Sequence, residues 1–380
     1  MMKLSPFQWT SFNFFGYFCT YGVLMPFFPI WLEYNDYSSE IIGFLLASGY
    51  LFRFLGSIVT PQIVTRPSRL LNVARLLSVL MLIACILMAY TVSSIWWLLP
   101  AFAFFHIVNG GAMTIGDAIA STWQKQVGID YGKSRLFGSI AFVVGSLTTG
   151  YIVGWFGEQT IIWLMTGFFV FLLSGQILGT NCNFVDPEKS KTTSKISYIS
   201  LLKDKTILRM LIATSLIQAA HATYYTYSTL YWKSQGIDPQ TASLLWGLSV
   251  ASEVAIFFIS GKLFANKKIH HLIIIATTLA IIRWVLYAST VAIPLLALGQ
   301  ILHAFTFGLA HFAMIRYISN QDSELIPKLQ GLYFGLGFSG VTALFTLFAS
   351  LTYGYSPSLS FLLMALLVAP AIIVVPRLKN

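Results

Sequence analysis

The sequence predicts an all-α membrane protein with twelve transmembrane helices in two pseudo-symmetric six-helix halves, and three observations support this fold class. Of the 380 residues, 57% are hydrophobic and only 9% are charged, whereas a soluble domain carries about a quarter of its residues as Asp, Glu, Lys and Arg. The chain contains a series of long apolar runs, and a polar stretch divides that series in the middle. This composition excludes soluble, disordered, collagen-like and disulfide-framework proteins.

The apolar runs have the length that a membrane requires. A spanning helix needs about 20 mostly apolar residues, because the hydrocarbon core is roughly 30 Å thick and an α-helix rises about 1.5 Å per residue. The first run is too long for a signal peptide, and it lacks a small-residue cleavage site before Glu33. We therefore expect all the runs to span the membrane. They cover residues 9–32, 41–61, 69–91, 95–123, 135–156, 160–180, 207–232, 240–263, 271–289, 293–318, 326–353 and 357–376.

The basic residues predict the orientation. Arg53 and Arg283 lie inside apolar runs and only Lys233 falls in an outer loop, so nearly all other Lys and Arg residues lie at the opposite side. Loops rich in Lys and Arg stay in the cytoplasm. We therefore expect a multi-pass protein of a bacterial-type cytoplasmic (inner) membrane with both termini in the cytoplasm.

The polar stretch 181–206 reads as a cytoplasmic linker between an N-terminal half, 1–180, and a C-terminal half, 207–380. The fifth and eleventh runs are both rich in glycine, which indicates a faint internal repeat. Two six-helix halves joined by a linker are typical of a rocking transporter with its site between the halves at mid-depth. Because two halves already enclose a pathway, we expect a monomer.

Nothing in the sequence predicts nucleic-acid binding, metal binding or enzymatic chemistry. The net charge of +10 comes from short gaps between apolar runs and not from one basic face. Cys19, Cys85 and Cys182 are odd in number and lack metal-ligand spacing. No nucleophile elbow or phosphate-binding glycine loop is present. We therefore expect no catalytic residues, no metal and no bound cofactor.

Ionisable residues inside the runs are the candidate functional residues. A charge in lipid costs several kcal/mol, so such a residue must face a cavity or a partner. A structural ion pair or a hydrogen bond between helices is the alternative for each of them. They are Arg53, Asp117, Arg135, Glu253 and Arg283, with His106, His221, His303 and His311.

Helical spacing places some of these residues on shared faces. His106 and Asp117 are eleven residues apart, which is about 20° beyond three full turns. A second set falls within about 80° on the run 293–318, and its members are Gln300, His303, Phe307 and His311.

The charge balance of these residues favours an anionic substrate. Three arginines stand against two acids, which leaves about one excess positive charge at membrane depth. Rings such as Tyr224 and Phe307 lie in the same runs. Most other aromatic residues are expected to pack against lipid or in interfacial belts.

Six segments carry a family resemblance: Thr122-Trp-Gln-Lys-Gln126, Asp130-Tyr-Gly-Lys133, Arg135-Leu-Phe-Gly-Ser139, His221-Ala-Thr-Tyr-Tyr225, Gln300-Ile-Leu-His303 and Ala313-Met-Ile-Arg-Tyr-Ile318. In this order they resemble the 3-phenylpropionate transporter family of the major facilitator superfamily, which is related to lactose permease. The resemblance extends over essentially all the runs. It implies alternating access and proton symport, with the proton as coupling ion.

The lactose-permease pattern carries over only in part. Its acid and the arginine eighteen residues on match Asp117 and Arg135, and its arginine and histidine pair matches Arg283 and His303. The acid that carries the permease proton is Thr306 here. Glu253 lies about one turn from the permease glutamate, and the tryptophan that stacks on sugar is Phe142, so the resemblance does not imply sugar binding.

These observations together predict a proton-coupled importer of a small organic anion such as an aromatic monocarboxylate. Arg135 or Arg53 would hold the carboxylate, and Asp117 would orient Arg135. A buried glutamate, Glu253, would take a proton outside and release it inside. The expected substrate-binding residues are Arg53, Asp117, Arg135, His221, Tyr224, Phe142 and Phe307, and the expected proton-coupling residues are Glu253, Arg283, His303 and His311.

Two alternatives remain at this stage. One is a proton symporter for a neutral glycoside or nucleoside, which competition by sugars would distinguish. The other is a membrane sensor or scaffold that transports nothing, although such a protein needs a cytoplasmic effector domain and the loops are short.

Overall fold

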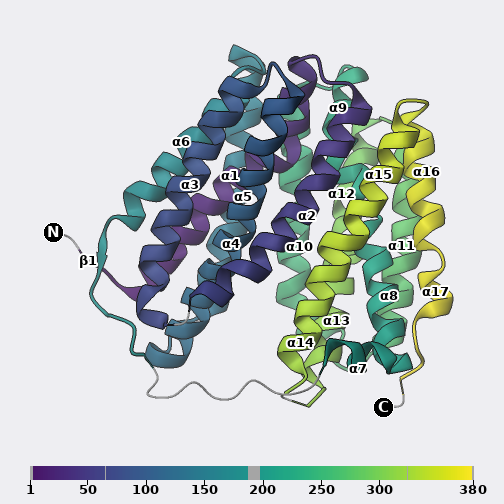
Figure 1. Ribbon diagram of the computed structural model, residues 1–380. Helices are drawn as coiled ribbons and strands as arrows, with labels where there is room; N and C mark the ends of the chain where they lie inside the picture. Colours follow the sequence, from purple (N-terminus) through teal and green to yellow (C-terminus); the bar gives the residue numbers. More distant parts are fainter. Residues whose placement is uncertain (1–2, 65, 187–196, 323, 379–380) are drawn as a thin grey trace. The chain divides into compact units, whose positions relative to one another are not determined.

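The computed structural model describes residues 3–64, 66–186, 197–322 and 324–378, and it is almost entirely helical (Figure 1). The strands in the described part form a parallel pair of β1 (Lys3–Leu4) and β2 (Gly179–Thr180). Ten helical stretches among the described residues are long and apolar enough to cross a membrane. The predicted all-α membrane class is confirmed.

The chain forms two compact units. Unit 1 comprises Met1–Ser38, Leu51–Ser190 and Ile237–Gly247, and unit 2 comprises Ser39–Tyr50, Lys191–Gly236 and Leu248–Asn380. The predicted halves 1–180 and 207–380 stay a prediction, because the boundaries of the units differ from them. Unit 2 includes residues 39–50 of the predicted N-terminal half, and unit 1 includes residues 237–247 of the predicted C-terminal half. Part of the predicted linker, residues 187–196, lies outside the described residues.

Unit 1 is built around its first helix, which packs against three others (Figure 1). This helix, α1 (Pro6–Tyr34), is buried along most of its length, and a Cβ at Gly145 on α5 (Tyr131–Phe156) would meet the carbonyl oxygen of Cys19 on α1. Glycine at this position therefore lets the two helix backbones touch. The helices are α1 (Pro6–Tyr34), α2 (Ser39–Ile63, from Leu51 onward), η1 (Pro67–Arg69), α3 (Leu70–Thr91), α4 (Ile95–Val127), α5 (Tyr131–Phe156) and α6 (Thr160–Gln176).

The crossing of α2 and α4 also depends on a close backbone approach. A Cβ at Gly56 on α2 would meet the carbonyl oxygen of Ile107 on α4, and a Cβ at Gly110 would meet that of Arg53. The backbone of Arg53 on α2 therefore lies directly against α4 at this crossing.

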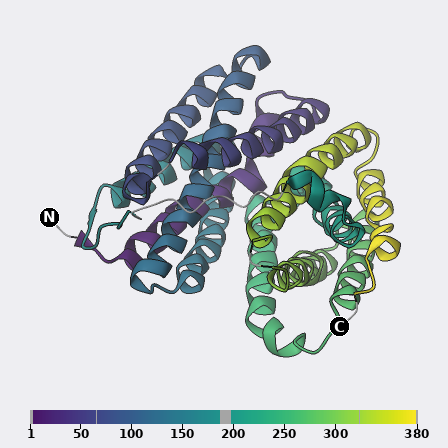
Figure 2. The same ribbon diagram turned by 60° about the horizontal axis from the view of Figure 1, so that its bottom comes forward.

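Unit 2 contains the remaining helices, which Figure 2 shows closer to end-on in teal to yellow. In this unit α11 (Ile269–Ser289) packs against α12 (Ile293–His303), η2 (Ala304–Leu309), α13 (Ala310–Ser319) and α16 (Pro357–Val368), and α8 (Lys205–Ala219) packs against η3 (Tyr333–Val341). The helices are α7 (Tyr198–Lys203), α8 (Lys205–Ala219), α9 (Ala222–Ser234), α10 (Pro239–Leu263, from Leu248 onward), α11 (Ile269–Ser289), α12 (Ile293–His303), η2 (Ala304–Leu309), α13 (Ala310–Ser319), α14 (Ile326–Leu332), η3 (Tyr333–Val341), α15 (Thr342–Tyr353), α16 (Pro357–Val368) and α17 (Ala371–Val374).

Several expected spans are not continuous α-helices. The run 207–232 breaks between α8 and α9, and the runs 293–318 and 326–353 contain the π-helical turns η2 and η3. The run 357–376 breaks at Pro370, which has no N–H to continue the helix. The helix of the run 160–180 ends at Gln176, because the chain continues into β2.

Side-chain caps mark where some of the described helices begin. Ser5 and Gln8 form a capping box at α1, and Asp204 accepts from the backbone N–H groups of Thr206 and Ile207 at α8. Such caps satisfy amide groups that have no partner inside the helix. Polar residues at loop ends therefore set the boundaries that hydropathy alone leaves open.

The segment 181–186 follows β2 and is tied to unit 1. The ring of Phe184 stacks on Trp123 with centroids 4.5 Å apart, and Gln126 exchanges two hydrogen bonds with the backbone of Val185. Asp186 accepts from the backbone N–H of Ser68 (2.9 Å) and from its hydroxyl (2.7 Å). These bonds hold the pKa of Asp186 below its ordinary value.

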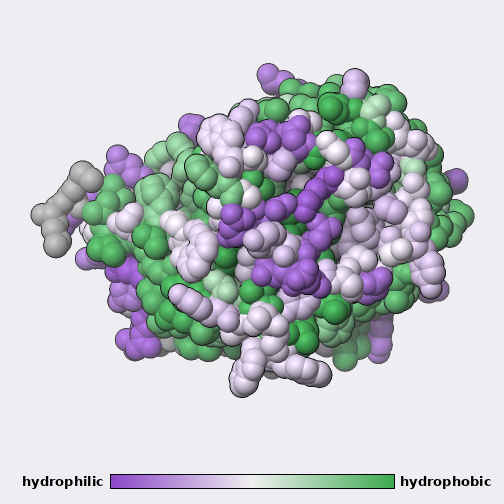
Figure 3. All heavy atoms as spheres, turned by 90° about the horizontal axis from the view of Figure 1, so that it is seen from above, coloured by the Kyte–Doolittle hydropathy of each residue, from purple (hydrophilic) through white to green (hydrophobic). Residues whose placement is uncertain are grey.

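The surface agrees with a protein in a bilayer. Many large apolar side chains on the helices are exposed, such as Trp96, Tyr90 and Ile373. Figure 3 shows hydrophilic side chains on helix ends that face the viewer and hydrophobic side chains on the flanks of the helices. A soluble protein rarely exposes so many large apolar side chains.

Candidate functional site

Two irregular helical segments position the polar cluster of unit 2. Between α8 and α9 the backbone N–H of His221 donates to Gln218 (3.2 Å), so it does not serve the carbonyl of Ile217. The His221 Nδ1 lies 3.0 Å from that carbonyl oxygen and takes the place of the missing amide. The second segment is η2, which carries Thr306. π-helical turns are frequent at functional sites.

Arg283 on α11 is the centre of this cluster and is fully buried. Its Nη1 lies 3.0 Å from His303 Nδ1 and donates to Thr306 Oγ1 at 3.1 Å. Its Nε and Nη2 have no hydrogen-bond partner among the described residues. Instead, three ring faces cover the guanidinium carbon at 4.6 to 5.3 Å from their centroids: Tyr224, Trp284 and Tyr287. Ring faces attract a cation, so they offset part of its desolvation cost.

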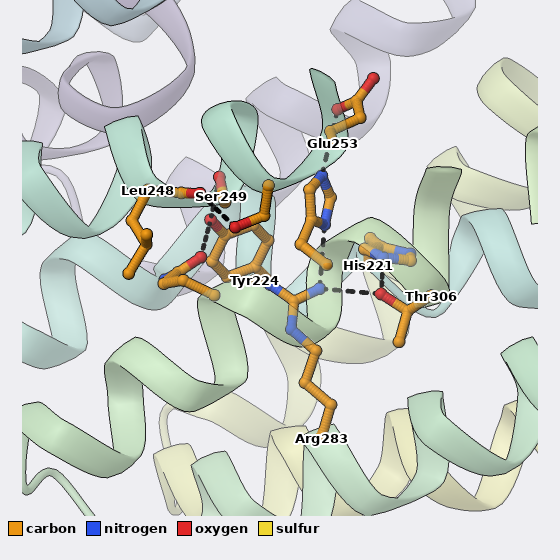
Figure 4. Close-up of polar contacts among 10 residues, drawn as sticks. His221, Tyr224, Leu248, Ser249, Glu253, Arg283 and Thr306 are labelled. Atoms are coloured by element: carbon orange, nitrogen blue, oxygen red, sulfur yellow. Dashed lines mark hydrogen bonds and ion pairs between the residues drawn. The ribbon is translucent and has the colours of Figure 1, made fainter. Parts of the chain in front are cut away.

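Glu253 on α10 completes the cluster through His303 (Figure 4). The His303 Nε2 lies 3.6 Å from Glu253 Oε2, and the glutamate side chain is 24% exposed. The imidazole of His303 therefore lies between the buried cation and the acid. His221 joins the same cluster, since its Nε2 lies 3.1 Å from Thr306 Oγ1.

Tyr224 and His311 extend the cluster in two directions. The Tyr224 hydroxyl donates to Gln300 Oε1 at 2.8 Å and also contacts Ser249. The Phe307 ring stacks between His303 and His311, with centroids 5.2 and 6.2 Å away. His311 Nδ1 lies 3.1 Å from the hydroxyl of Tyr333, to which Gln218 also donates.

Unit 1 holds the other predicted charges. The guanidinium of Arg135 lies over the rings of Phe18 (4.1 Å) and Phe14 (5.4 Å), and that of Arg53 lies 5.1 Å from the Tyr21 ring centroid. No ion pair joins Arg135 to a carboxylate in the described part of the chain.

Asp117 contacts a residue that sequence reasoning missed. Its Oδ1 accepts from the Tyr131 hydroxyl at 3.0 Å, and Arg135 lies within its electrostatic reach. The expectation that Asp117 orients Arg135 stays a prediction. Phe142 is buried and its ring centroid lies 6.3 Å from that of Trp246.

The structure thus brings together the predicted residues His221, Tyr224, Glu253, Arg283 and His303 in unit 2. Sequence reasoning missed the rings that cover the arginines. Tyr287 follows Arg283 by four residues, so helical spacing could have found it, whereas Trp284 is the next residue and helical spacing does not place it beside the guanidinium. His106, a further candidate, is buried in unit 1, and its ring nitrogens have no hydrogen-bond partner among the described residues.

Comparison with known proteins agrees with these features. A family model described as the MFS_1 like family matches residues 7–363. The chain is similar to the "Probable 3-phenylpropionic acid transporter" of Escherichia coli (strain K12), with 34% identity over 99% of both chains. It is also 22% identical to the "Uncharacterized transporter YwbF" of Bacillus subtilis (strain 168), over 57% of this chain and 53% of that protein.

Solved structures show the same fold at low sequence identity. The nucleoside transporter NupG superposes with a TM-score of 0.82 at 13% identity, over 98% of this chain and 99% of that one. The POT family transporter PepTSo superposes with a TM-score of 0.74 at 10% identity, over 97% and 96%. The resemblance seen in the sequence is therefore confirmed at the level of the family. The chain belongs to the MFS_1 like family and is a membrane transporter, not an enzyme.

Proposed function

We propose that the protein is a proton-coupled importer of a small aromatic monocarboxylate, with 3-phenylpropionate as the first candidate. The observation that carries the proposal is Arg135, whose guanidinium is held by ring faces and has no carboxylate partner in the described residues. A substrate carboxylate would supply the missing partner, and the neighbouring rings would suit an aromatic body. The name of the relative from Escherichia coli supports the same substrate class.

Arg53 is the second candidate for the substrate anion. Its guanidinium also lies against a ring, that of Tyr21, in the same unit. Asp117 and Tyr131 would set the polar environment of Arg135, and Phe142 would contribute apolar contact to the substrate.

The cluster of unit 2 would couple a proton to the anion. With neutral histidines, Arg283 carries a positive charge and ionised Glu253 a negative charge, so the two balance. A proton on Glu253 would leave the charge of Arg283 uncompensated, and the cluster would then favour the arrival of an anion. Release of the proton inside would restore the balance and favour release of the substrate. In this scheme His303 transmits the change because it lies between both charges.

The proposal includes the finer architecture. Twelve spans would be reached by counting α6 and the pair α8 and α9 with the ten long stretches. They would form two six-helix halves that admit substrate alternately from each side of a cytoplasmic membrane. The protein would work as a monomer with both termini in the cytoplasm, with the proton as its coupling ion and no cofactor.

Uptake of radiolabelled 3-phenylpropionate into vesicles that contain the purified protein tests the substrate. We expect accumulation only with an inward proton gradient, and we expect other aromatic acids to compete. Competition by neutral sugars or by uridine in place of aromatic acids would contradict the proposal and favour the glycoside or nucleoside symporter. Absence of any transport would favour the sensor or scaffold.

Substitution of Glu253 tests the coupling. We expect Glu253→Gln to abolish gradient-driven accumulation, because the amide cannot take up the proton, while exchange of labelled for unlabelled substrate continues. Glu324→Gln is the matched control, since Glu324 is an exposed acid outside the cluster. Accumulation in Glu253→Gln equal to that of the control would remove Glu253 from the mechanism.

A further inference from the structure

The direction of each hydrogen bond in the cluster of unit 2 can be derived from two groups whose roles are fixed. A backbone carbonyl oxygen only accepts, and a guanidinium only donates and stays protonated. These groups form a chain of hydrogen bonds that begins at the carbonyl of Ile217 and ends at Arg283. Between them lie His221 and Thr306 (Figure 4).

The carbonyl of Ile217 determines the tautomer of His221. Because Nδ1 faces this carbonyl oxygen at 3.0 Å, Nδ1 must carry the hydrogen. The neutral ring then offers a lone pair on Nε2, and the Thr306 hydroxyl at 3.1 Å donates to it. A second proton on His221 would leave the Thr306 hydroxyl facing two donors, and it would place another positive charge near Arg283.

Thr306 in turn constrains Arg283. Since its hydroxyl hydrogen points to His221, its oxygen is available to accept from Arg283 Nη1 at 3.1 Å. Both hydrogen bonds of the guanidinium to described residues use Nη1, one to Thr306 and one to His303. One hydrogen of Nη1 therefore points to Thr306 and the other to His303. Because the guanidinium only donates, His303 Nδ1 must accept this hydrogen bond.

This arrangement also fixes His303. If Nδ1 accepts, the hydrogen of the neutral ring is on Nε2, which faces Glu253 Oε2 at 3.6 Å. We propose that His221 and Thr306 are positioning residues that orient the Arg283 guanidinium and thereby hold His303 as the Nε2–H tautomer facing Glu253. The effect of this positioning on proton coupling rests on the proposed function. The assignment of the His221 and His303 tautomers does not.

The role assigned to His221 differs from direct substrate contact. Its side chain is fully buried, and the contacts of both ring nitrogens are within the protein. Its Nδ1 bonds the Ile217 carbonyl at the helix break, and its Nε2 bonds Thr306 in the cluster. Two different substitutions of His221 can therefore test the two contacts separately. Among the described residues of unit 2, the titratable and charged groups around the cluster include Tyr50 on α2, Tyr224 and Tyr225 on α9, Glu253 on α10, Arg283 and Tyr287 on α11, His303 on α12, His311 on α13 and Tyr333 on η3.

The first test reads the tautomers directly and needs no transport. The full-length protein is labelled with ¹⁵N-histidine in lipid, and single His→Asn variants assign the ring signals by solid-state NMR. We expect His221 to be neutral with the hydrogen on Nδ1 and His303 to be neutral with the hydrogen on Nε2. A hydrogen on Nε2 of His221, or on Nδ1 of His303, would overturn the proposal.

The second test removes the hydroxyl of Thr306. We expect Thr306→Val to lower the rate of gradient-driven uptake about tenfold, the effect of losing one hydrogen bond to a charged group, and to change the pH dependence of exchange. Thr306→Ser keeps the hydroxyl and should stay within about twofold of the unsubstituted protein. Thr277→Val on α11 is the matched control, because that buried hydroxyl donates to the Ile273 carbonyl of its own helix. Equal uptake in Thr306→Val and Thr277→Val would contradict the proposal.

The third test separates the two nitrogens of His221. In His221→Asn the amide nitrogen replaces Nδ1 and keeps the bond to Ile217, but the acceptor for Thr306 is lost, so uptake should fall as in Thr306→Val. In His221→Gln the amide reaches the position of Nε2, so uptake per folded molecule should stay closer to that of the unsubstituted protein. The opposite order would show that His221 acts only on the helix break. If the unsubstituted protein transports no aromatic acid, the proposed function fails, and the NMR result still decides the tautomers.

Discussion

Arg283 is a cation that the protein holds with very few acceptors. Two hydrogen bonds and three ring faces surround a fully buried guanidinium. A buried charge without partners would cost several kcal/mol, so the rings are part of the reason that this residue can stay inside the bundle. The sequence predicts that Arg283 is functional because it is ionisable in an apolar run. It cannot predict Tyr224 as its cover, because that ring comes from a different helix.

Gly56 permits a test of backbone packing at a single residue. We expect Gly56→Ala to destabilise the protein by about 1–3 kcal/mol, the usual cost of overpacking, because the new methyl group would meet the Ile107 carbonyl. A backbone carbonyl in a helix can move aside only if the helix itself is displaced or distorted, which destabilises the fold. The loss of folded protein on heating in detergent measures the effect.

Gly167→Ala on α6 is the control for this prediction. A Cβ there meets nothing within 4 Å, so the substitution carries no steric cost. Equal heat stability of both variants would show that α2 and α4 can separate without loss.

At the scale of elements, hydropathy predicts where helices lie but not where they are interrupted. The break at Pro370 could be predicted, since proline ends a helix. The break at Ala220 and His221 has no proline or glycine beside it, and the side chain of His221 compensates for it. The π turn η2 likewise packs against α11 and contacts His221 through Thr306, and both partners lie far from it in the sequence or on another helix. These interruptions position the residues of the site. The sequence could therefore predict which residues belong to the site, but not how they contact one another.

The segment 181–186 gives a prediction at the same scale. We expect Asp186→Ala to speed hydrogen exchange of the Ser68 amide, which loses its acceptor. The pKa of Asp186 is lowered in the folded protein. Its contribution is therefore fully present above the ordinary aspartate pKa of about 3.9 and is lost as the pH falls through the lowered value. The difference in exchange should stay constant from about pH 6 to 8, as measured by mass spectrometry.

Asp130→Ala is the control for the Ser68 amide. Asp130 caps α5 by accepting from the Lys133 amide, so its loss should affect that amide and leave Ser68 unchanged. An unchanged Ser68 amide in Asp186→Ala would show that the Asp186 bonds do not hold this turn.

At the scale of the whole molecule, three cysteines can report the orientation in the membrane. Cys19 and Cys85 are buried, while Cys182 on the segment after β2 is partly exposed. If both termini lie in the cytoplasm, as proposed, a membrane-impermeant maleimide should label the protein in inverted vesicles and not in right-side-out vesicles. Cys182→Ser should abolish the labelling. Labelling of the unsubstituted protein from the outside would reverse the proposed topology.

The π turns η2 and η3 also leave a trace in sequence comparison. A π turn closes its hydrogen bonds over five residues where an α-helix uses four, so it holds one residue more than the helix needs. Homologous chains that lack the turn should align with a single-residue gap inside the helix, between 304 and 309 or between 333 and 341. Beyond such a gap the matching positions shift by one, and an ungapped alignment would pair His311 or Thr342 with residues on the wrong side of the helix.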